Sequence, residues 1–296
     1  MPILSTALAF ALMQTPADPM RLPIGAKGEV KVEVGQIVAT RDGKVSTIDD
    51  IAKAADGKRF IFLGENHATR PHQQLQADII AALVKRGRKV AIGLEMYTRP
   101  KQDWLDQWSA GTLEEADFLE KSEWKTQWGY PFEFYKPVFD VAKSNKLPMI
   151  ALNVPRDWVR QVGRKGPMGL TTEAKLQLPA ELFLGNQSHR DVFAALMGGH
   201  PPTGPAGENM YSAQVLWDEG MADTALKWLE RTPTDPQTVF VVIAGSGHVM
   251  YSQGINYRIQ RRTKQRGITV VMGQAKEPTM VAKGIGDFVY ITEEAK

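Results

Sequence analysis

The chain has 296 residues, of which 43% are hydrophobic, 23% charged and 8% aromatic. This composition is typical of a globular domain with a sizeable core, and it excludes the fibrous and disordered classes. The formal net charge is +3, and the opposite charges are mostly interspersed, so the sequence offers little support for a nucleic-acid partner. No cysteine is present, which excludes disulfides, thiolate catalysis and zinc–thiolate sites. The densest basic stretch, Arg258 to Arg266, is interpreted as a solvated helix face, the alternative being a surface that contacts phosphate.

The first twenty residues differ from the rest of the chain. An apolar run from Ile3 to Met13 is followed by small and turn residues. It has the length of a signal-peptide core and is too short to span a bilayer. We predict that residues 1–20 are an export signal or a disordered N-terminus. A frayed N-terminal helix remains the alternative, because no Lys or Arg precedes the run and Pro16 makes a poor cleavage site.

Alternating apolar and polar residues over 29–46 predict a small antiparallel ribbon with turns at Gly35 and Asp42–Gly43. Thr47 and the acids after it are typical of a helix N-terminus, so a short helix is expected over 48–55. Residues 21–296 are predicted to form a single domain.

Strands then alternate with helices along the chain. Continuous apolar runs are typical of strands buried on both faces of a parallel sheet. They occur at residues 59–63, 90–94, 149–152 and 239–244, and amphipathic helices are expected over 74–85, 132–143 and 211–229. Two later runs, 268–272 and 288–291, are predicted to be edge strands. The fold class is therefore α/β, with a mainly parallel sheet flanked by helices on both sides.

Two segments depart from this alternation. Residues 100–130 carry Trp104, Trp108, Trp124 and Trp128, two pairs four residues apart, and are predicted to be a helical insertion whose tryptophans form core rather than a ligand site. Residues 164–208 are rich in Gly, Pro and Thr and are predicted to be a cap or excursion.

Ionisable side chains follow the predicted parallel strands. Ligands bind outside the carboxyl ends of such strands, where loops converge. The residues that occur there are Glu65, His67, Glu95, Asn153, Arg156 and His248. Each alone is more often a loop hydrogen-bond partner, but together they indicate a functional rim. We expect Glu65, His67, Glu95 and His248 to lie within about 10 Å of one another, with the pKa of at least one carboxyl raised unless a cation neutralises the site.

The rim fits none of the common catalytic motifs. His67 and His72 are five residues apart with no Glu between them, unlike a zinc-protease helix, and Ser246 lacks the glycine that a nucleophile elbow needs. Two imidazoles and two carboxylates are suitable ligands for a divalent metal. Without a metal, the same groups could act as acid and base.

Five ordered blocks resemble the ChaN-like haem-binding uptake family, which is similar in fold to the erythromycin-esterase and TraB/Tiki proteins. They are GENHATRPHQQLQADII, GLEMY, GYPFEFYKPVFDVAKSNKLPMIALNVPRD, NMYSAQVLWDEGMAD and VVIAGSGHVMYSQGINYRI, and the resemblance covers about residues 58–292. It implies a bacterial exported or outer-membrane-associated protein, whose founding type binds haem between two cofacial protomers. With no lipobox cysteine, it implies a soluble periplasmic or secreted form.

The resemblance also assigns residues. In Tiki-type relatives, the blocks that hold Glu65, His67, Glu95 and His248 bind a divalent metal for hydrolysis, with His72 just beyond. The haem-binding type uses a tyrosine and a later histidine before the NMYSAQ block. The corresponding span here runs from His189 to His200, so His189 stands where that tyrosine is expected, the alternative being that both are ordinary loop histidines.

Two functions follow from this reasoning. The first is an exported haem-uptake protein that holds haem through His189 and His200, as a homodimer around the macrocycle. The second is a metal-dependent hydrolase that uses Glu65, His67, Glu95 and His248, with His72, Asn153 and Arg156 as substrate-binding residues.

Overall fold

The computed structural model describes residues 17–199, 203–232, 235 and 237–294. The apolar run of the predicted export signal and the predicted ligand His200 lie outside these residues. Among the described residues, no helix is both long and apolar enough to cross a membrane.

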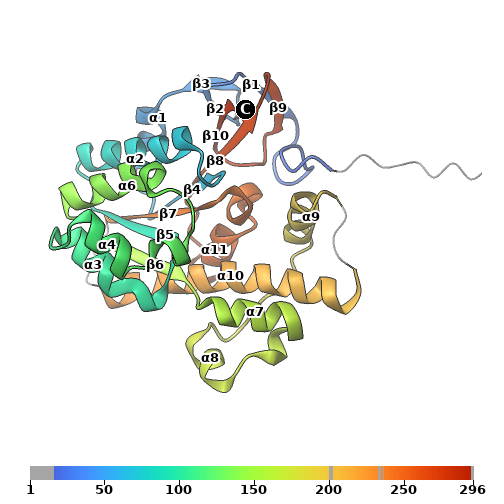
Figure 1. Cartoon of the computed structure of the whole chain (residues 1–296). Helices are drawn as coiled ribbons and strands as arrows, with labels where there is room; N and C mark the ends of the chain where they lie inside the picture. The colour runs from blue at the N-terminus through green and yellow to red at the C-terminus, as the bar shows by residue number, and fades with distance from the viewer. Residues whose placement is uncertain (1–16, 200–202, 233–234, 236, 295–296) are drawn as a thin grey trace, which may run out of the picture.

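An eight-stranded sheet forms the centre of the molecule, in the order β3-β2-β10-β8-β4-β7-β5-β6 (Figure 1). Its strands are β2 (Ile37–Ala39), β3 (Lys44–Ser46), β4 (Phe60–Glu65), β5 (Val90–Thr98), β6 (Met149–Asn153), β7 (Val239–Gly245), β8 (Ile268–Ala275) and β10 (Phe288–Glu293). Adjacent strands from β10 to β6 are parallel, and only the pairings of β2 with β10 and with β3 are antiparallel. This arrangement confirms the predicted α/β class with a mainly parallel sheet.

Two details of the sheet differ from the prediction. β1 (Glu29–Val32) does not join the β2–β3 hairpin but pairs antiparallel with β9 (Thr279–Ala282) in a separate two-stranded sheet. β8 and β10 are interior strands rather than edges: β8 lies between β10 and β4, and the β2–β3 hairpin extends the sheet beyond β10. The alternation in residues 29–46 revealed strands, but it did not reveal their partners.

Helices cover both faces of the sheet. The early helices are α1 (Ile48–Ala54), α2 (Arg70–Lys85), α3 (Gln102–Ala110), α4 (Glu115–Lys121), α5 (Trp124–Gln127) and α6 (Phe132–Asn145). The later ones are α7 (Arg156–Lys165), α8 (Thr172–Gln177), α9 (Gln187–Leu196), α10 (Gly204–Arg231) and α11 (Ile255–Thr263). Short 3₁₀ turns occur at η1 (Arg99–Lys101), η2 (Pro167–Gly169), η3 (Ser246–His248) and η4 (Met250–Ser252).

Successive residues of each central strand point to opposite faces, so the core has two main parts. Ile61 and Leu63 of β4 pack with α1, α2 and α6, whereas Phe60 and Phe62 pack with α10 and α11. In Figure 1, α2 and α6 lie above the sheet and α10 runs along its lower side, with α7 and α8 beneath.

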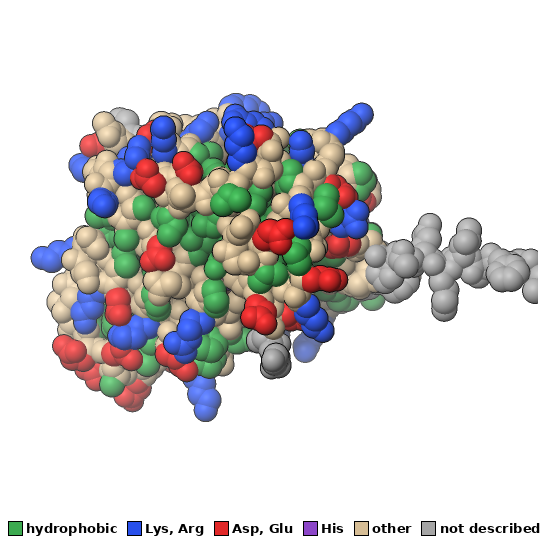
Figure 2. Space-filling view, turned by 90° about the horizontal axis from the view of Figure 1, so that it is seen from above, with side chains coloured by type: hydrophobic (Ala, Val, Ile, Leu, Met, Phe, Trp, Pro, Cys, Tyr) green, Lys and Arg blue, Asp and Glu red, His purple; other side chains and the backbone are tan. Residues whose placement is uncertain are grey.

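The two segments that interrupt the strand–helix alternation, residues 100–130 and 164–208, form helices outside the sheet. Trp108 is 1% exposed and Trp124 is 5% exposed, both in the core beside α6. Within residues 164–208, α9 lies beside α10 on the right of Figure 1. Seen from above, the molecule shows hydrophobic, acidic and basic side chains interspersed, and no histidine is visible on that face (Figure 2).

Candidate functional site

β4 ends in a carboxylate that holds a histidine in place. Glu65 is 2% exposed, and its oxygens accept hydrogen bonds from the Tyr135 hydroxyl at 2.9 Å and the Gln76 amide at 2.9 Å. His67 Nδ1 lies 3.0 Å from the same Glu65 oxygen that Tyr135 contacts. Because this carboxylate oxygen accepts, Nδ1 carries the proton, and Nε2 of the neutral ring is left with its lone pair.

The neighbouring strands bring a second carboxylate and imidazole to the same place. His248 in η3, directly after β7, has Nε2 3.3 Å from a Glu95 oxygen, and the Gly245 N–H donates to the other Glu95 oxygen at 2.6 Å. A Cβ added to Gly245 would lie 3.0 Å from His67 Cε1 and 3.7 Å from Glu95 Oε2. Both pairs therefore border one point at the carboxyl ends of β4, β7 and β5, which are adjacent in the sheet.

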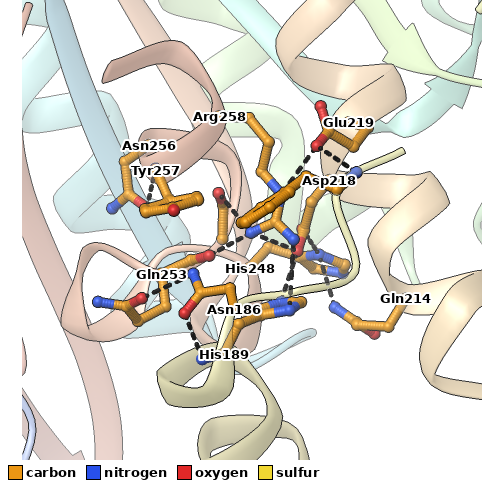
Figure 3. Close-up of polar contacts among 12 residues, drawn as sticks. Asn186, His189, Gln214, Asp218, Glu219, His248, Gln253, Asn256, Tyr257 and Arg258 are labelled. Carbon is orange, nitrogen blue, oxygen red and sulfur yellow. Dashed lines mark hydrogen bonds and ion pairs between the residues drawn. The ribbon is translucent and has the colours of Figure 1, made fainter. Parts of the chain in front are cut away.

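A buried aspartate links this rim to the sheet face covered by α10. Asp218 of α10 is fully buried, with His248 Nδ1 2.6 Å and His189 Nε2 2.9 Å from its two oxygens. Arg258 of α11 lies 3.8 Å from the same carboxylate. Figure 3 shows Asp218 among these side chains, which come from α9, α10, α11 and η3. Glu95, His248, Asp218 and His189 thus form a continuous chain of hydrogen-bonding groups.

The carboxylates of Glu95 and Asp218 determine the charge of the histidine between them. Burial alone would lower the pKa of His248, but Glu95 and Asp218 together raise it to about 10. Burial alone would likewise raise the carboxyl pKa values, yet His248 lowers those of both Glu95 and Asp218. His248 is therefore an imidazolium at neutral pH. The expected raised carboxyl is not seen at Glu95, because histidine supplies the neutralising cation.

His67 is less enclosed than His248. Its side chain is 30% exposed, and its ring lies edge-on to Trp128, with centroids 4.6 Å apart, and 5.8 Å from Tyr130. Burial lowers the pKa of His67, but its hydrogen bond to Glu65 and the charge of Glu95 outweigh this and raise it. His67 Nε2 makes no hydrogen bond to any residue that the structure describes, so it can accept a proton or bind an iron atom.

His189, predicted to be a haem ligand, lies in the interior. It is 1% exposed, and its Nδ1 is 2.9 Å from the Tyr211 hydroxyl while Nε2 faces Asp218. Burial, the first cause, lowers its pKa despite Asp218. Both ring nitrogens are occupied, so His189 does not present a free nitrogen to haem in this conformation. It follows the cap residue Asn186 into α9.

The predicted substrate-binding residues make hydrogen bonds within the protein. His72 is fully buried, accepts the Asn66 N–H and contacts Gly273 O and Thr292, and burial lowers its pKa to about 4. Asn153 bonds the backbone of Glu95 and Val154. Arg156 bonds the Gln127 carbonyl at the start of α7. Their bonds are those of residues that hold loops and strands together.

The metal site expected from Glu65, His67, Glu95 and His248 is not supported. Across the described parts of the chain, no group of three or more His, Asp or Glu side chains is arranged to hold a metal ion. The physical reason is that the carboxylate oxygens are already used by Tyr135, Gln76, the Gly245 N–H and the histidines. The hydrolase hypothesis that depended on this metal is not favoured.

Sequence reasoning missed Asp218, Arg258, Tyr135 and Gln76, because these residues come from helices rather than strand ends. Asp218 carried a signal nonetheless: it lies in the middle of a predicted amphipathic helix, next to Glu219 and apolar neighbours. Acids on the apolar side of a helix need a partner. The partners of Asp218 are His248 and His189, with Arg258 of α11 slightly farther away, and Arg258 also lies 3.7 Å from Glu219.

Four exposed apolar side chains lie before α6, at the end of α9 and in the first part of α10. Tyr130, Leu196, Met197 and Met210 are each about 40% exposed. Leu196 lies close to Gly247 of η3, since a Cβ there would be 2.7 Å from its Cδ1. Met210 lies one turn before Gln214, whose amide is 3.1 Å from His248 Nδ1. A flat apolar ligand would find contact area at this edge of the sheet.

The sequence and fold have known counterparts. The family described as haem-binding uptake, Tiki superfamily, ChaN matches residues 51–259. The solved structure titled cofacial heme binding to ChaN of Campylobacter jejuni has a TM-score of 0.59 at 19% identity, covering 88% of this chain and 97% of that one. A mutant of the erythromycin esterase EreC in its open conformation has a TM-score of 0.47 at 14% identity, over 82% of this chain and 77% of that one.

One plant protein is also similar in sequence. Protein RETICULATA-RELATED 5, chloroplastic, from Arabidopsis thaliana is 24% identical in an alignment of 253 residues that covers 78% of this chain. The match covers only 34% of that plant protein, so this chain spans about a third of its length.

Proposed function

This chain belongs to the ChaN family of haem-binding uptake proteins in the Tiki superfamily, and from that membership we propose that it binds haem and serves in haem uptake. The observation that carries the proposal to a particular site is the Glu65–His67 pair. A histidine that ligates iron commonly donates its other ring N–H to a carboxylate, which fixes the ring and makes the ligating nitrogen more basic. His67 has this arrangement, with Nδ1 on Glu65 and Nε2 without a partner among the described residues.

The rest of the rim supports a planar apolar ligand. Trp128 and Tyr130 lie against the His67 ring, and Leu196 and Met210 provide further exposed apolar surface nearby. Haem ligation by histidine is common, and the macrocycle itself needs mainly apolar contact. The same geometry argues against His189, whose nitrogens are taken by Asp218 and Tyr211.

A second copy of the chain would complete such a site. The relative from Campylobacter jejuni is described by its title as binding haem cofacially. The rim of one protomer would contact only one face of the macrocycle and leave the other face in solvent. The rim of a second protomer would cover that exposed face. Our proposal is therefore a haem-linked homodimer, exported to the periplasm or secreted if residues 1–20 act as a signal.

Hemin titration of the apo-protein, followed at the Soret band, tests this proposal. We expect a saturable shift in the wild type and at least about a 10-fold weaker affinity in His67→Ala, because the iron loses its axial nitrogen. His189→Gln is the matched control and should keep the wild-type shift. Sedimentation velocity with and without hemin should show a dimer only when hemin is present.

Each alternative has its own result. Absence of any saturable shift in the wild type would remove haem binding altogether. A normal Soret shift in His67→Ala, with loss of the shift in His200→Ala or His189→Gln, would show that the histidine that binds the iron lies in the segment before α10. Circular dichroism of each variant distinguishes a lost ligand from an unfolded protein.

A further inference from the structure

A large cleft lies at the amino ends of the strands, whereas the rim lies at their carboxyl ends. Its volume is about 790 Å³, within the range of small-molecule sites in proteins. The walls come from α11, the β2–β3 turn, the loop before β10 and the segment around Gly25. Gly267 and Thr269 at the start of β8 form its floor, so the cleft opens at the amino ends of β8 and β10.

The charged side chains of the cleft are almost all cationic. Five Lys or Arg line it against a single carboxylate, Asp287: they are Arg41, Arg261, Lys264, Arg266 and Lys283. Asp287 already accepts a hydrogen bond from the Thr269 N–H at 2.8 Å. The chain as a whole has a net charge of only +3, so this concentration of cations is local to the cleft.

Several of these cations lack a counter-charge. Arg261 pairs with Glu181 at 2.8 Å, and Arg41 lies 3.9 Å from Asp42 at a highly exposed position. Lys264 donates only to the Arg261 carbonyl. In the described residues, no ion pair involves Arg266 or Lys283, which both line the cleft. Burial raises the pKa of Asp287, and the charges of Lys58 and Arg266 oppose that rise. Like charges gathered without partners repel one another, and a bound anion would relieve that repulsion.

The walls between the cations are held in a close and strained arrangement. A Cβ on Gly284 would lie 1.8 Å from the Ile24 carbonyl, so two backbone segments cross there in direct contact. Tyr251 and Ser252 have φ of 57° and 55°, in the left-handed region that L-residues rarely adopt. Strained backbone is found preferentially at binding sites, where the surrounding packing supports it.

We propose that this cleft binds a small molecule with at least two anionic oxygen groups, held by Lys264, Arg266 and Lys283. Phosphate and carboxylate oxygens share the chemistry that Arg and Lys recognise through charge-assisted hydrogen bonds. Tyr257 also lines the cleft and could contact an organic part of the ligand. This site is separate from the haem rim, and its occupant does not depend on haem binding.

Isothermal titration of the purified full chain tests the proposal with three probes: pyrophosphate, tripolyphosphate and citrate at matched ionic strength. Saturable binding of either phosphate probe but not citrate identifies a phosphate ligand, and the reverse identifies a polycarboxylate. We expect the double variant Arg266→Gln with Lys283→Gln to lower the affinity for the probe that binds by about 10-fold or more. Lys264→Gln, a third lining cation, should also weaken the affinity for that probe.

The matched control removes two cations elsewhere. Lys125→Gln with Lys175→Gln makes the same change in net charge at exposed positions on α5 and α8, and it should leave the affinity unchanged. Equal weakening in this control would mean a general charge effect and would overturn the proposal. So would the absence of saturable binding by all three probes. Thermal unfolding without anion confirms that each variant folds.

Discussion

Asp218→Asn offers the sharpest test of the buried network. The substitution keeps the size of the side chain but removes the charge that lies 2.6 Å from His248 Nδ1 and 2.9 Å from His189 Nε2. An amide can accept only one of these N–H groups, and its NH₂ then faces the other as a second donor. Arg258 and His248 lose a shared counter-ion in a fully buried place.

The cost follows from that geometry. Removing one partner of a buried charge pair typically costs about 3–5 kcal/mol, because the remaining charge is left uncompensated. His248 can lose its proton once Asp218 is neutral, because its pKa of about 10 depends on Glu95 and Asp218 together. That deprotonation offsets part of the free-energy cost. We therefore expect the free energy of unfolding to fall by about 3 kcal/mol. With a urea slope of about 3 kcal/mol per M, the midpoint should fall by about 1 M.

Urea unfolding followed by tryptophan fluorescence measures this change, and histidine NMR measures the pKa of His248. Asp191→Asn on α9 is the control: it also neutralises an aspartate, but at an exposed position, and should change stability by no more than about 0.5 kcal/mol. A loss below about 1 kcal/mol in Asp218→Asn, together with an unchanged His248 titration, would refute the network as described.

Further predictions concern the rim, the packing and pH. Tyr135→Phe leaves Glu65 and the Ala68 N–H each without a hydroxyl partner, so unfolding by urea should show a loss of about 1–3 kcal/mol. Gly64→Ala places a Cβ 2.5 Å from Val249 Cγ2 and should lower the thermal midpoint through a cost of about 1–3 kcal/mol. His248 has a raised pKa, so its contribution is complete below about pH 6.5 and is lost as pH rises through about 10; the stability difference between wild type and His248→Gln should shrink over that interval, and a constant difference would contradict the assignment. His67 also has a raised pKa, so hemin affinity should increase as pH rises through it; affinity independent of pH would argue against Nε2 as the ligand.

The strands of the parallel sheet were predictable because they are continuous apolar runs. Residues 239–244 became β7 and residues 59–63 became β4, each within one or two residues of the predicted bounds. Strand partners were not predictable in the same way. The placement of β10 inside the sheet depends on where the β2–β3 hairpin pairs, which is a long-range choice that no local pattern contains.

The rim was partly predictable for a related reason. Parallel strands deliver their carboxyl ends to one edge, so reading the residue after each strand found Glu65, Glu95 and His248. The same rule said nothing of Asp218, because it considers only the residues that follow strands and Asp218 lies within α10. Helix residues enter the site only once the packing of α10 and α11 on the sheet is known.

The basic stretch Arg258–Arg266 contributes cations both to the buried network around Asp218 and to the cationic cleft. Successive helix residues turn by about 100°, so Arg258 and Arg262, four apart, share one face of α11, while Arg261 lies on a second face, followed by Lys264, the left-handed residue that caps the helix. The first face is turned inward: Arg258 is 1% exposed near Asp218, and Arg262 pairs with Glu219. The second lines the cationic cleft. The interpretation of this stretch as a solvated face was therefore wrong for Arg258, and its repeated cations follow from helical geometry that divides them between a buried network and an open anion site.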